Sequence, residues 1–203
     1  MADRQETAPA GPGPAGDPAA ALLAVIDMQP VFAAGSPWAT PGFAALTEPV
    51  MTLVRAFGPR VVFTRFVVPD DPQGSWVDYY DRWRFVTAPE AAPLLELADP
   101  WRQLAQHVVS KPTFSKWGPE LQGLLGAFAP LVLCGVATDC CVLATALAAL
   151  DHGARVRVVS DATAGVSAPA HAAALGLLAG FAPQAHVSTV AEELAGLAVS
   201  ARR

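Results

Sequence analysis

Two adjacent cysteines, Cys140 and Cys141, follow a short apolar run, Leu131–Cys134. The run predicts a buried strand, Gly135 permits a sharp turn, and residues 138–152 are expected to form a helix. Both thiols then fall in the first helical turn, where free N–H groups and the helix dipole favour a thiolate. Since the same N–H groups can hold an oxyanion, this stretch predicts a nucleophile beside its oxyanion hole. The alternative is that the cysteines are small core residues, as we expect for Cys134.

An aspartate and a lysine are predicted to lie at strand ends. Asp27 ends the apolar run 21–27, and Lys111 follows the run 106–110. A carboxylate in a dry crevice can take a thiol proton, and an ammonium group stabilises both anions. Lys111 and Lys116 are the only lysines in the chain. Taken singly, Asp27 is equally well a turn cap and Lys111 a solvated loop residue.

Apolar strands alternate with helical segments along the chain. This pattern predicts a doubly wound α/β fold with a mainly parallel, six-stranded sheet and helices on both faces. Sites in such folds form at the carboxyl ends of the strands, so Asp27, Lys111 and residues 138–141 are expected to share one crevice. The expected strands are residues 21–27, 60–65, 106–110, 131–134, 155–160 and 186–188. The expected helices are residues 48–57, 120–128, 138–152, 167–181 and 190–200.

The composition favours one domain over residues 20–203, after a disordered tail, 1–19, rich in Ala, Pro and Gly. The net charge of −5 and the pI of about 5.2, without a basic run, argue against nucleic acid or a membrane surface as partner. No signal peptide, transmembrane run or disulfide pattern is recognisable, so a cytoplasmic protein is expected. Residues 67–104 are expected to be irregular and contain several aromatic residues. Some of these are expected in a lid or binding loop, and others in a hydrophobic flap packed on the body or in a dimer contact.

Three segments resemble the isochorismatase-like cysteine hydrolases, which include nicotinamidases, N-carbamoylsarcosine amidohydrolases and ureidoacrylate amidohydrolases. They are Ala24-Val-Ile-Asp-Met-Gln29, Val108-Val-Ser-Lys-Pro-Thr-Phe-Ser115 and Gly135-Val-Ala-Thr-Asp-Cys-Cys-Val142. The resemblance covers about residues 20–190. It implies the isochorismatase-like three-layer fold and hydrolysis of a small molecule.

The resemblance also implies a role for individual residues. Asp27, Lys111 and Cys141 match the family's catalytic triad, with Cys141 as the nucleophile. A cis peptide is implied at Val136–Ala137, which would direct the N–H groups of Ala137 and Cys141 at the oxyanion. The substrate pocket is expected to include Gln29, Phe32, Trp76, Tyr79, Trp117 and Thr138.

Two departures from the family narrow the expected reaction. The histidine-rich metal motif of nicotinamidases is missing after the second strand, where the chain reads Thr64-Arg-Phe-Val-Val-Pro69, so no metal is expected. True isochorismatases lack the thiol that Cys141 provides. No strand is followed by Gly-x-Gly-x-x-Gly, so no dinucleotide cofactor is expected either.

The sequence therefore predicts a metal-independent amidohydrolase without cofactors. It would cleave a C–N bond (amide, lactam or ureido) of a small molecule through a thioester on Cys141. One alternative is an isochorismatase-type hydrolase acting on a non-amide bond, and another is a catalytically silent binding or assembly module. By resemblance, a homodimer or homotetramer is expected.

Overall fold

The computed structural model describes residues 21–126, 129–200 and 202. The predicted tail, residues 1–19, lies outside the described residues. The core is a six-stranded sheet with strand order β3-β2-β1-β4-β5-β6, in which every neighbouring pair is parallel. The predicted doubly wound α/β fold is thereby confirmed. The strands are β1 (Leu22–Ile26), β2 (Val61–Phe66), β3 (Val108–Lys111), β4 (Leu131–Val136), β5 (Val156–Ala164) and β6 (Ala185–Ser188).

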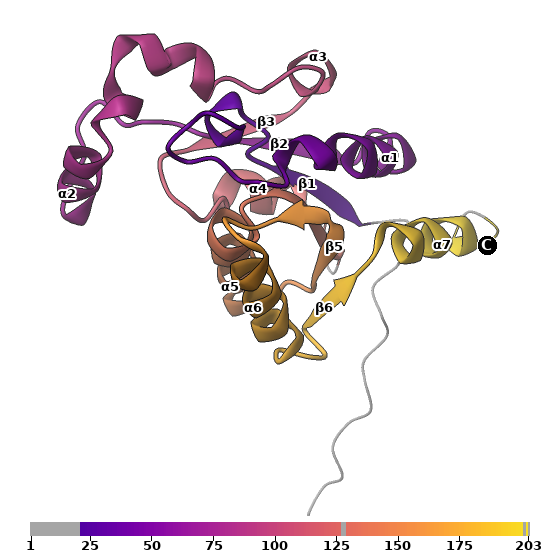
Figure 1. Ribbon diagram of the computed structural model, residues 1–203. Coiled ribbons are helices and arrows are strands. Elements are labelled where there is room, and N and C mark those ends of the chain that lie inside the picture. The colour runs from indigo at the N-terminus through magenta and orange to yellow at the C-terminus, as the bar shows by residue number, and fades with distance from the viewer. Residues whose placement is uncertain (1–20, 127–128, 201, 203) are drawn as a thin grey trace, which may run out of the picture.

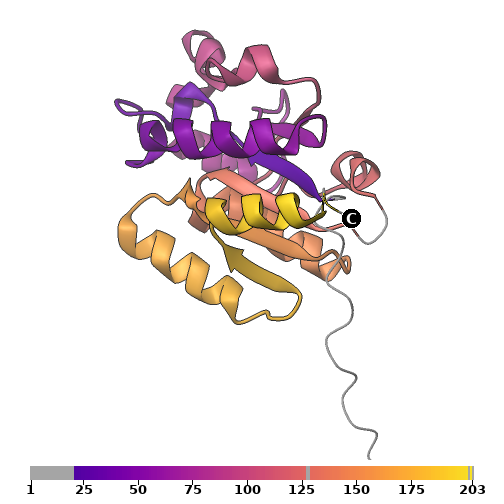
Figure 2. The ribbon, with the colours of Figure 1, turned by 90° about the vertical axis from the view of Figure 1, so that its right-hand side faces the viewer.

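Helices cover both faces of the sheet (Figure 1). The helices α1 and α7 lie side by side on one face (Figure 2), and α4, α5 and α6 pack on the other. None of the helices in the described ranges is long and apolar enough to cross a lipid bilayer. The helices are α1 (Thr47–Phe57), α2 (Ser75–Arg82), α3 (Trp101–Leu104), α4 (Pro119–Leu124), α5 (Leu143–Asp151), α6 (Ala168–Ala179) and α7 (Val190–Ser200).

Strand β1 has a core on each side because successive side chains of a strand point to opposite faces. Leu23 and Val25 pack with α1, whereas Leu22, Ala24 and Ile26 pack with α4, α5 and α6. A strand buried on both faces must be apolar throughout, and this is why its sequence shows no alternation.

The strand order places the chemistry-bearing residues together. The chain runs outward from β1 through β2 to β3 and then returns to β4 on the other side of β1. The carboxyl ends of β1 and β4 therefore flank the topological switch point, where doubly wound folds form their sites. Asp27 follows β1 there, and the turn Thr138–Val142, here called the cysteine turn, follows β4.

Residues 67–104, here called the aromatic flap, are more ordered than the expected irregular connection. They contain α2, α3 and two 3-10 turns, Arg84–Thr87 and Pro89–Leu95. Each of these elements is only four to eight residues long, so no long periodic pattern marks them in the sequence. Other boundaries also differ. Strand β5 continues to Ala164, and the helix expected over 120–128 ends at Leu124. The helix expected over 138–152 begins instead as a π-helical turn, and α5 starts only at Leu143. Residues 127–128 lie outside the described residues.

Gly135 allows β4 to pass close to the end of β1. Its φ is +101°, and a Cβ there would lie 2.1 Å from the carbonyl oxygen of Ile26. Any side chain would therefore push apart the two strands that carry Asp27 and the thiols.

We predict that Gly135→Ala lowers the free energy of unfolding by about 3 kcal/mol or more, because backbone strain and overpacking add. Gly176→Ala is the matched control, since Gly176 lies in α6 and a Cβ added there would meet no atom within 4 Å. It should stabilise the protein by about 0.5–1 kcal/mol. Urea unfolding measures both variants, and equal midpoints for Gly135→Ala and wild type would refute this account of Gly135.

Candidate active site

Asp27 is a fully buried carboxyl group at the carboxyl end of β1. Its φ is +48°, a left-handed conformation that Asp tolerates better than most residues. The Thr64 hydroxyl accepts a hydrogen bond from the Asp27 N–H (3.2 Å) and donates to Oδ1 of the carboxyl group (2.6 Å). Thr64, on the neighbouring strand β2, thus fixes both the backbone turn and the orientation of the side chain.

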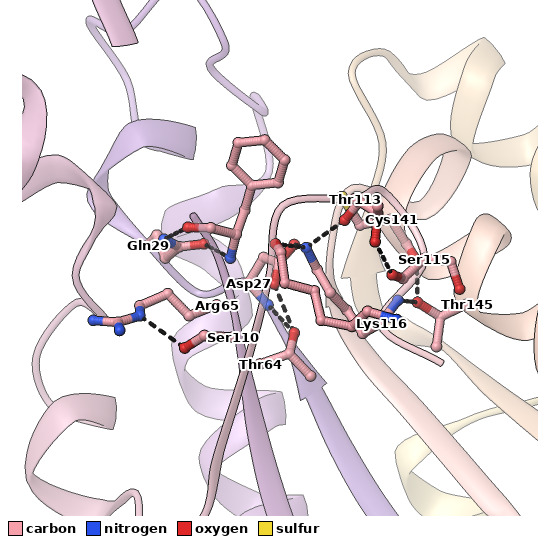
Figure 3. Close-up of polar contacts among 12 residues, drawn as sticks. Asp27, Gln29, Thr64, Arg65, Ser110, Thr113, Ser115, Lys116, Cys141 and Thr145 are labelled. Carbon is pink, nitrogen blue, oxygen red and sulfur yellow. Dashed lines mark hydrogen bonds and ion pairs between the residues drawn. The ribbon is translucent and has the colours of Figure 1, made fainter. Parts of the chain in front are cut away.

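Lys116 is the cation beside this carboxylate (Figure 3). Its Nζ lies 3.1 Å from Oδ2 of Asp27, and neither side chain has any exposed surface. The ammonium group also donates to the carbonyl of Thr113 (2.8 Å) and lies 4.9 Å from the centroid of the Phe66 ring. A buried charge costs several kcal/mol unless it is paired and hydrogen-bonded, and here each charge has such partners.

The expectation that Lys111 lies beside Asp27 is corrected by this geometry. The Lys111 ammonium group donates instead to the carbonyl oxygen of Trp117 (2.6 Å). Only the backbone of Lys111 approaches the ion pair, with its carbonyl oxygen 3.5 Å from Nζ of Lys116. After β3 the chain folds back in a short turn, which brings a residue five positions later to the carboxylate.

Thr145 links the turn that carries Lys116 to the turn that carries Cys140 and Cys141. The Thr145 hydroxyl accepts a hydrogen bond from the N–H of Lys116 (2.8 Å) and donates to the carbonyl of Cys141 (2.6 Å). Thr145 lies on α5, four residues after Cys141, so its side chain reaches back along the same helix face. The sequence prediction missed Thr145 and Thr64, although a buried threonine inside an apolar segment is a usable signal.

The two thiols lie in a single π-helical turn, Thr138–Val142, between β4 and α5. The hydrogen bond with Cys140 raises the pKa of Cys141 well above its usual value, and burial and the charge of Asp27 add to this. The same hydrogen bond lowers the pKa of Cys140. This direction favours the neutral thiol at Cys141, whereas the helix dipole alone predicts a thiolate. Cys134 is fully buried in the sheet, which confirms it as a core residue.

The backbone just before the thiols is arranged to leave an N–H group free. The Val136–Ala137 peptide is cis, as the resemblance implied. The Ala137 carbonyl accepts from the N–H groups of Cys140 and Val142. For the Ala137 N–H itself, no backbone acceptor is found in the described ranges.

A cavity of about 520 Å³ opens above the cysteine turn. Its walls are mainly aromatic side chains from the aromatic flap and from the segment 32–40, and its floor includes both thiols. Two polar groups of the lining, the Trp38 indole N–H and the Thr40 hydroxyl, are buried and have no hydrogen-bond partner among the described residues. The lining residues are Phe32, Pro37, Trp38, Ala39, Thr40, Phe66, Tyr79, Trp83, Phe114, Ala137, Cys140, Cys141 and Val166.

Of the six expected pocket residues, Phe32 and Tyr79 line this cavity. Trp76 lies one layer behind, with its ring 4.9 Å from that of Phe114. Trp117 instead lines a separate cavity of about 310 Å³. These two corrections arise because an aromatic residue can pack on either side of a surface loop.

The remaining two expected pocket residues, Gln29 and Thr138, serve the scaffold. The buried Gln29 amide donates to the carbonyl of Phe66 (2.9 Å) and accepts from its N–H (2.8 Å). The Thr138 hydroxyl shares a hydrogen bond with Nδ1 of His171 (2.9 Å). Trp38, Trp83 and Phe114 line the cavity instead, and loop residues of this kind carry no periodic signal.

Residues 64–69, at the carboxyl end of β2 and just after it, do not form a metal-ligand set. Thr64 is committed to Asp27, and Arg65 pairs with Glu96 (2.6 Å). In the part of the chain that the structure describes, no group of three or more His, Cys, Asp or Glu side chains is placed to hold a metal ion.

A family model, the isochorismatase domain, matches residues 20–192. The chain belongs to the isochorismatase family. This membership supports a hydrolase function. Among curated proteins, none matches this sequence.

Solved structures of the family share its fold. The chain is similar to a cysteine hydrolase from Pseudomonas syringae pv. phaseolicola, with 22% identity and a TM-score of 0.77 over 90% of this chain and 94% of the other. It is also similar to a nicotinamidase from Bacillus subtilis, with 24% identity and a TM-score of 0.66 over 82% of this chain and 98% of the nicotinamidase. For an N-carbamoylsarcosine amidase from Thermoplasma acidophilum, the identity is 26% and the TM-score is 0.63, over 83% of this chain and 95% of the amidase.

We predict that the two lysines differ sharply on substitution. Lys116→Met leaves the Asp27 carboxylate buried and unpaired, which should cost about 3–5 kcal/mol of folding stability and abolish turnover. Lys111→Met, the matched control, removes one hydrogen bond to a carbonyl and should cost about 1–2 kcal/mol. Urea unfolding and product release measure the two effects. The opposite order, with Lys111→Met the more damaging variant, would contradict the assignment of Lys116.

Proposed function

We propose that this protein is a metal-independent cysteine amidohydrolase that cleaves a C–N bond of a small molecule through a thioester on Cys141. One observation carries the proposal: the charges of a fully buried Asp27–Lys116 pair act on Cys141, and Cys141 and Cys140 both line the cavity. The charges of Asp27 and Lys116 both act on Cys141. The carboxylate of Asp27 raises the pKa of this thiol, and the ammonium group of Lys116 lowers it. Such an arrangement suits a reaction in which a proton must leave and return to sulfur.

In the first half-reaction, the Asp27 carboxylate takes the proton from Sγ of Cys141. The sulfur forms a bond to the carbonyl carbon as the C=O electron pair moves to oxygen, and the N–H groups of Ala137 and Cys141 hold this oxyanion. The C–N bond then breaks, and the nitrogen takes the proton from Asp27. An amine leaves, and the acyl group remains on sulfur as a thioester.

In the second half-reaction, Asp27 takes a proton from water as the water oxygen attacks the thioester carbon. The C–S bond breaks, the sulfur recovers a proton from Asp27, and a carboxylic acid is released. Lys116 stays charged throughout and stabilises the carboxylate whenever Asp27 has lost its proton. Because the pKa of Cys141 is raised, the free thiolate is disfavoured and the reaction uses this base.

The motif position favours Cys141 over Cys140 as the nucleophile. Cys141 occupies the position of the family nucleophile, and only 3% of its surface is exposed, at the cavity floor. Cys140 is more exposed and accepts the hydrogen bond that lowers its pKa. We assign to Cys140 the role of a polar neighbour that orients the reacting thiol.

We predict that Cys141→Ala lowers amine release from hydrolysed amides by at least about 10³-fold, because the covalent route is lost. The matched control, Cys140→Ala, should stay within about tenfold of wild type, since it alters only a neighbouring group. Ammonia release from a panel of primary carboxamides measures both variants. Full activity of Cys141→Ala together with an inactive Cys140→Ala would show that the nucleophile has been misassigned.

A further inference from the structure

Within the described part of the chain, the cavity above the thiols is lined by no charged side chain. Its thirteen lining residues include no Asp, Glu, Lys, Arg or His. Burial, with smaller effects from Cys140 and Cys141, raises the pKa of Tyr79 well above its usual value, so this phenol stays neutral. A carboxylate or ammonium group entering the cavity would lose its hydration without gaining a partner of opposite charge.

The charged residues nearby are committed elsewhere. Arg84 pairs with Asp81 at 3.1 Å on the outside of the aromatic flap. Arg82 lies over the Trp83 ring, 5.3 Å from its centroid, and does not line the cavity. Beneath the floor, Asp27 and Lys116 neutralise each other. Neither Arg82 nor Arg84 lines the cavity.

The walls of the cavity are shaped by one aromatic residue, Trp38. Its ring lies between 5.3 and 6.2 Å from five other rings, three of them in the aromatic flap. Trp38 itself comes from the segment between β1 and α1, so it joins the flap to the body of the protein. These rings are those of Phe32, Phe66, Tyr79, Trp83 and Phe85.

Cavity size sets the scale of the substrate. Cavities of about 300–1,000 Å³ with mainly aromatic walls hold ligands of drug-like size. At about 520 Å³, this cavity has room for more than a single six-membered ring beside the reacting carbonyl. Flat aromatic walls favour flat aromatic ligands, which stack or meet them edge to face.

We propose that the site selects an uncharged amide whose acyl group contains two aromatic rings, and that Trp38 is the residue that determines this preference. The inference rests on the proposed function, which supplies the amide carbonyl. Apolar ring surface is buried against Trp38 and its neighbours, and the carbonyl carbon is held over the cavity floor.

The test uses the full chain carrying Cys141→Ala, so that binding is measured without turnover. Three amides are titrated by calorimetry: 2-naphthamide, benzamide, and 2-naphthamide with a carboxylate on the distal ring. Benzamide should bind at least about tenfold more weakly than 2-naphthamide, because it buries less apolar surface. The carboxylated analogue should also bind at least about tenfold more weakly, because its charge is desolvated without a partner.

Paired tryptophan variants test the role of Trp38. In the same background, Trp38→Leu should bring the affinities of 2-naphthamide and benzamide within about threefold of each other, because the extra ring has lost its contact. Trp117→Leu, the matched control, should preserve the wild-type ratio, since Trp117 lines the other cavity. If Trp38→Leu fails to fold, Trp38→Phe should reduce the ratio in the same direction.

The inference is overturned if the carboxylated analogue binds as tightly as 2-naphthamide, if no amide binds, or if the Trp38 variants keep the wild-type ratio. Wild-type protein is assayed in parallel for ammonia release. If 2-naphthamide binds with the expected preference but no amide of the panel or of a wider set is hydrolysed, the proposed function fails while the substrate preference stands.

Discussion

A buried ion pair constrains the whole site. Asp27 and Lys116 carry opposite charges with no exposed side-chain surface, and either charge alone would cost several kcal/mol. The pair therefore requires β1, β2 and the turn after β3 to close around it. Thr64 holds the carboxylate from one side, and Thr145 fastens the lysine turn to the cysteine turn from the other. Closure of these elements also places the thiols against the same charges.

Much of the fold was predictable because burial on both faces leaves a direct trace in sequence. The apolar runs located all six strands, and the rule that sites lie at the carboxyl ends of strands located Asp27 and the cysteine turn. The same rule chose Lys111, because it is the lysine at a strand end. The choice of Lys116 depends on how five residues fold back, which is decided by long-range contacts such as that of Lys116 with Thr145. Trp38 was missed for a related reason, since loops have no period.

The electrostatics of the thiols also depended on tertiary contacts. A helix N-terminus predicts a stabilised thiolate, but the hydrogen bond with Cys140, burial and the charge of Asp27 raise the pKa of Cys141. A neutral nucleophile beside a buried carboxylate is suited to a mechanism in which proton transfer accompanies attack. The uncharged aromatic cavity supports this mechanism, because a site that excludes water strengthens each electrostatic interaction at the reacting carbonyl.

The account depends most on Cys141 acting as the acyl acceptor. The direct measurement is to mix the protein with an activated ester, 4-nitrophenyl 2-naphthoate, quench with acid, and map the acyl group by peptide fragmentation. We expect a burst of about one nitrophenol per chain, with the naphthoyl group on Cys141 in wild type and in Cys140→Ala, and no burst in Cys141→Ala. A naphthoyl group found on Cys140, or a burst that survives Cys141→Ala, would contradict the account.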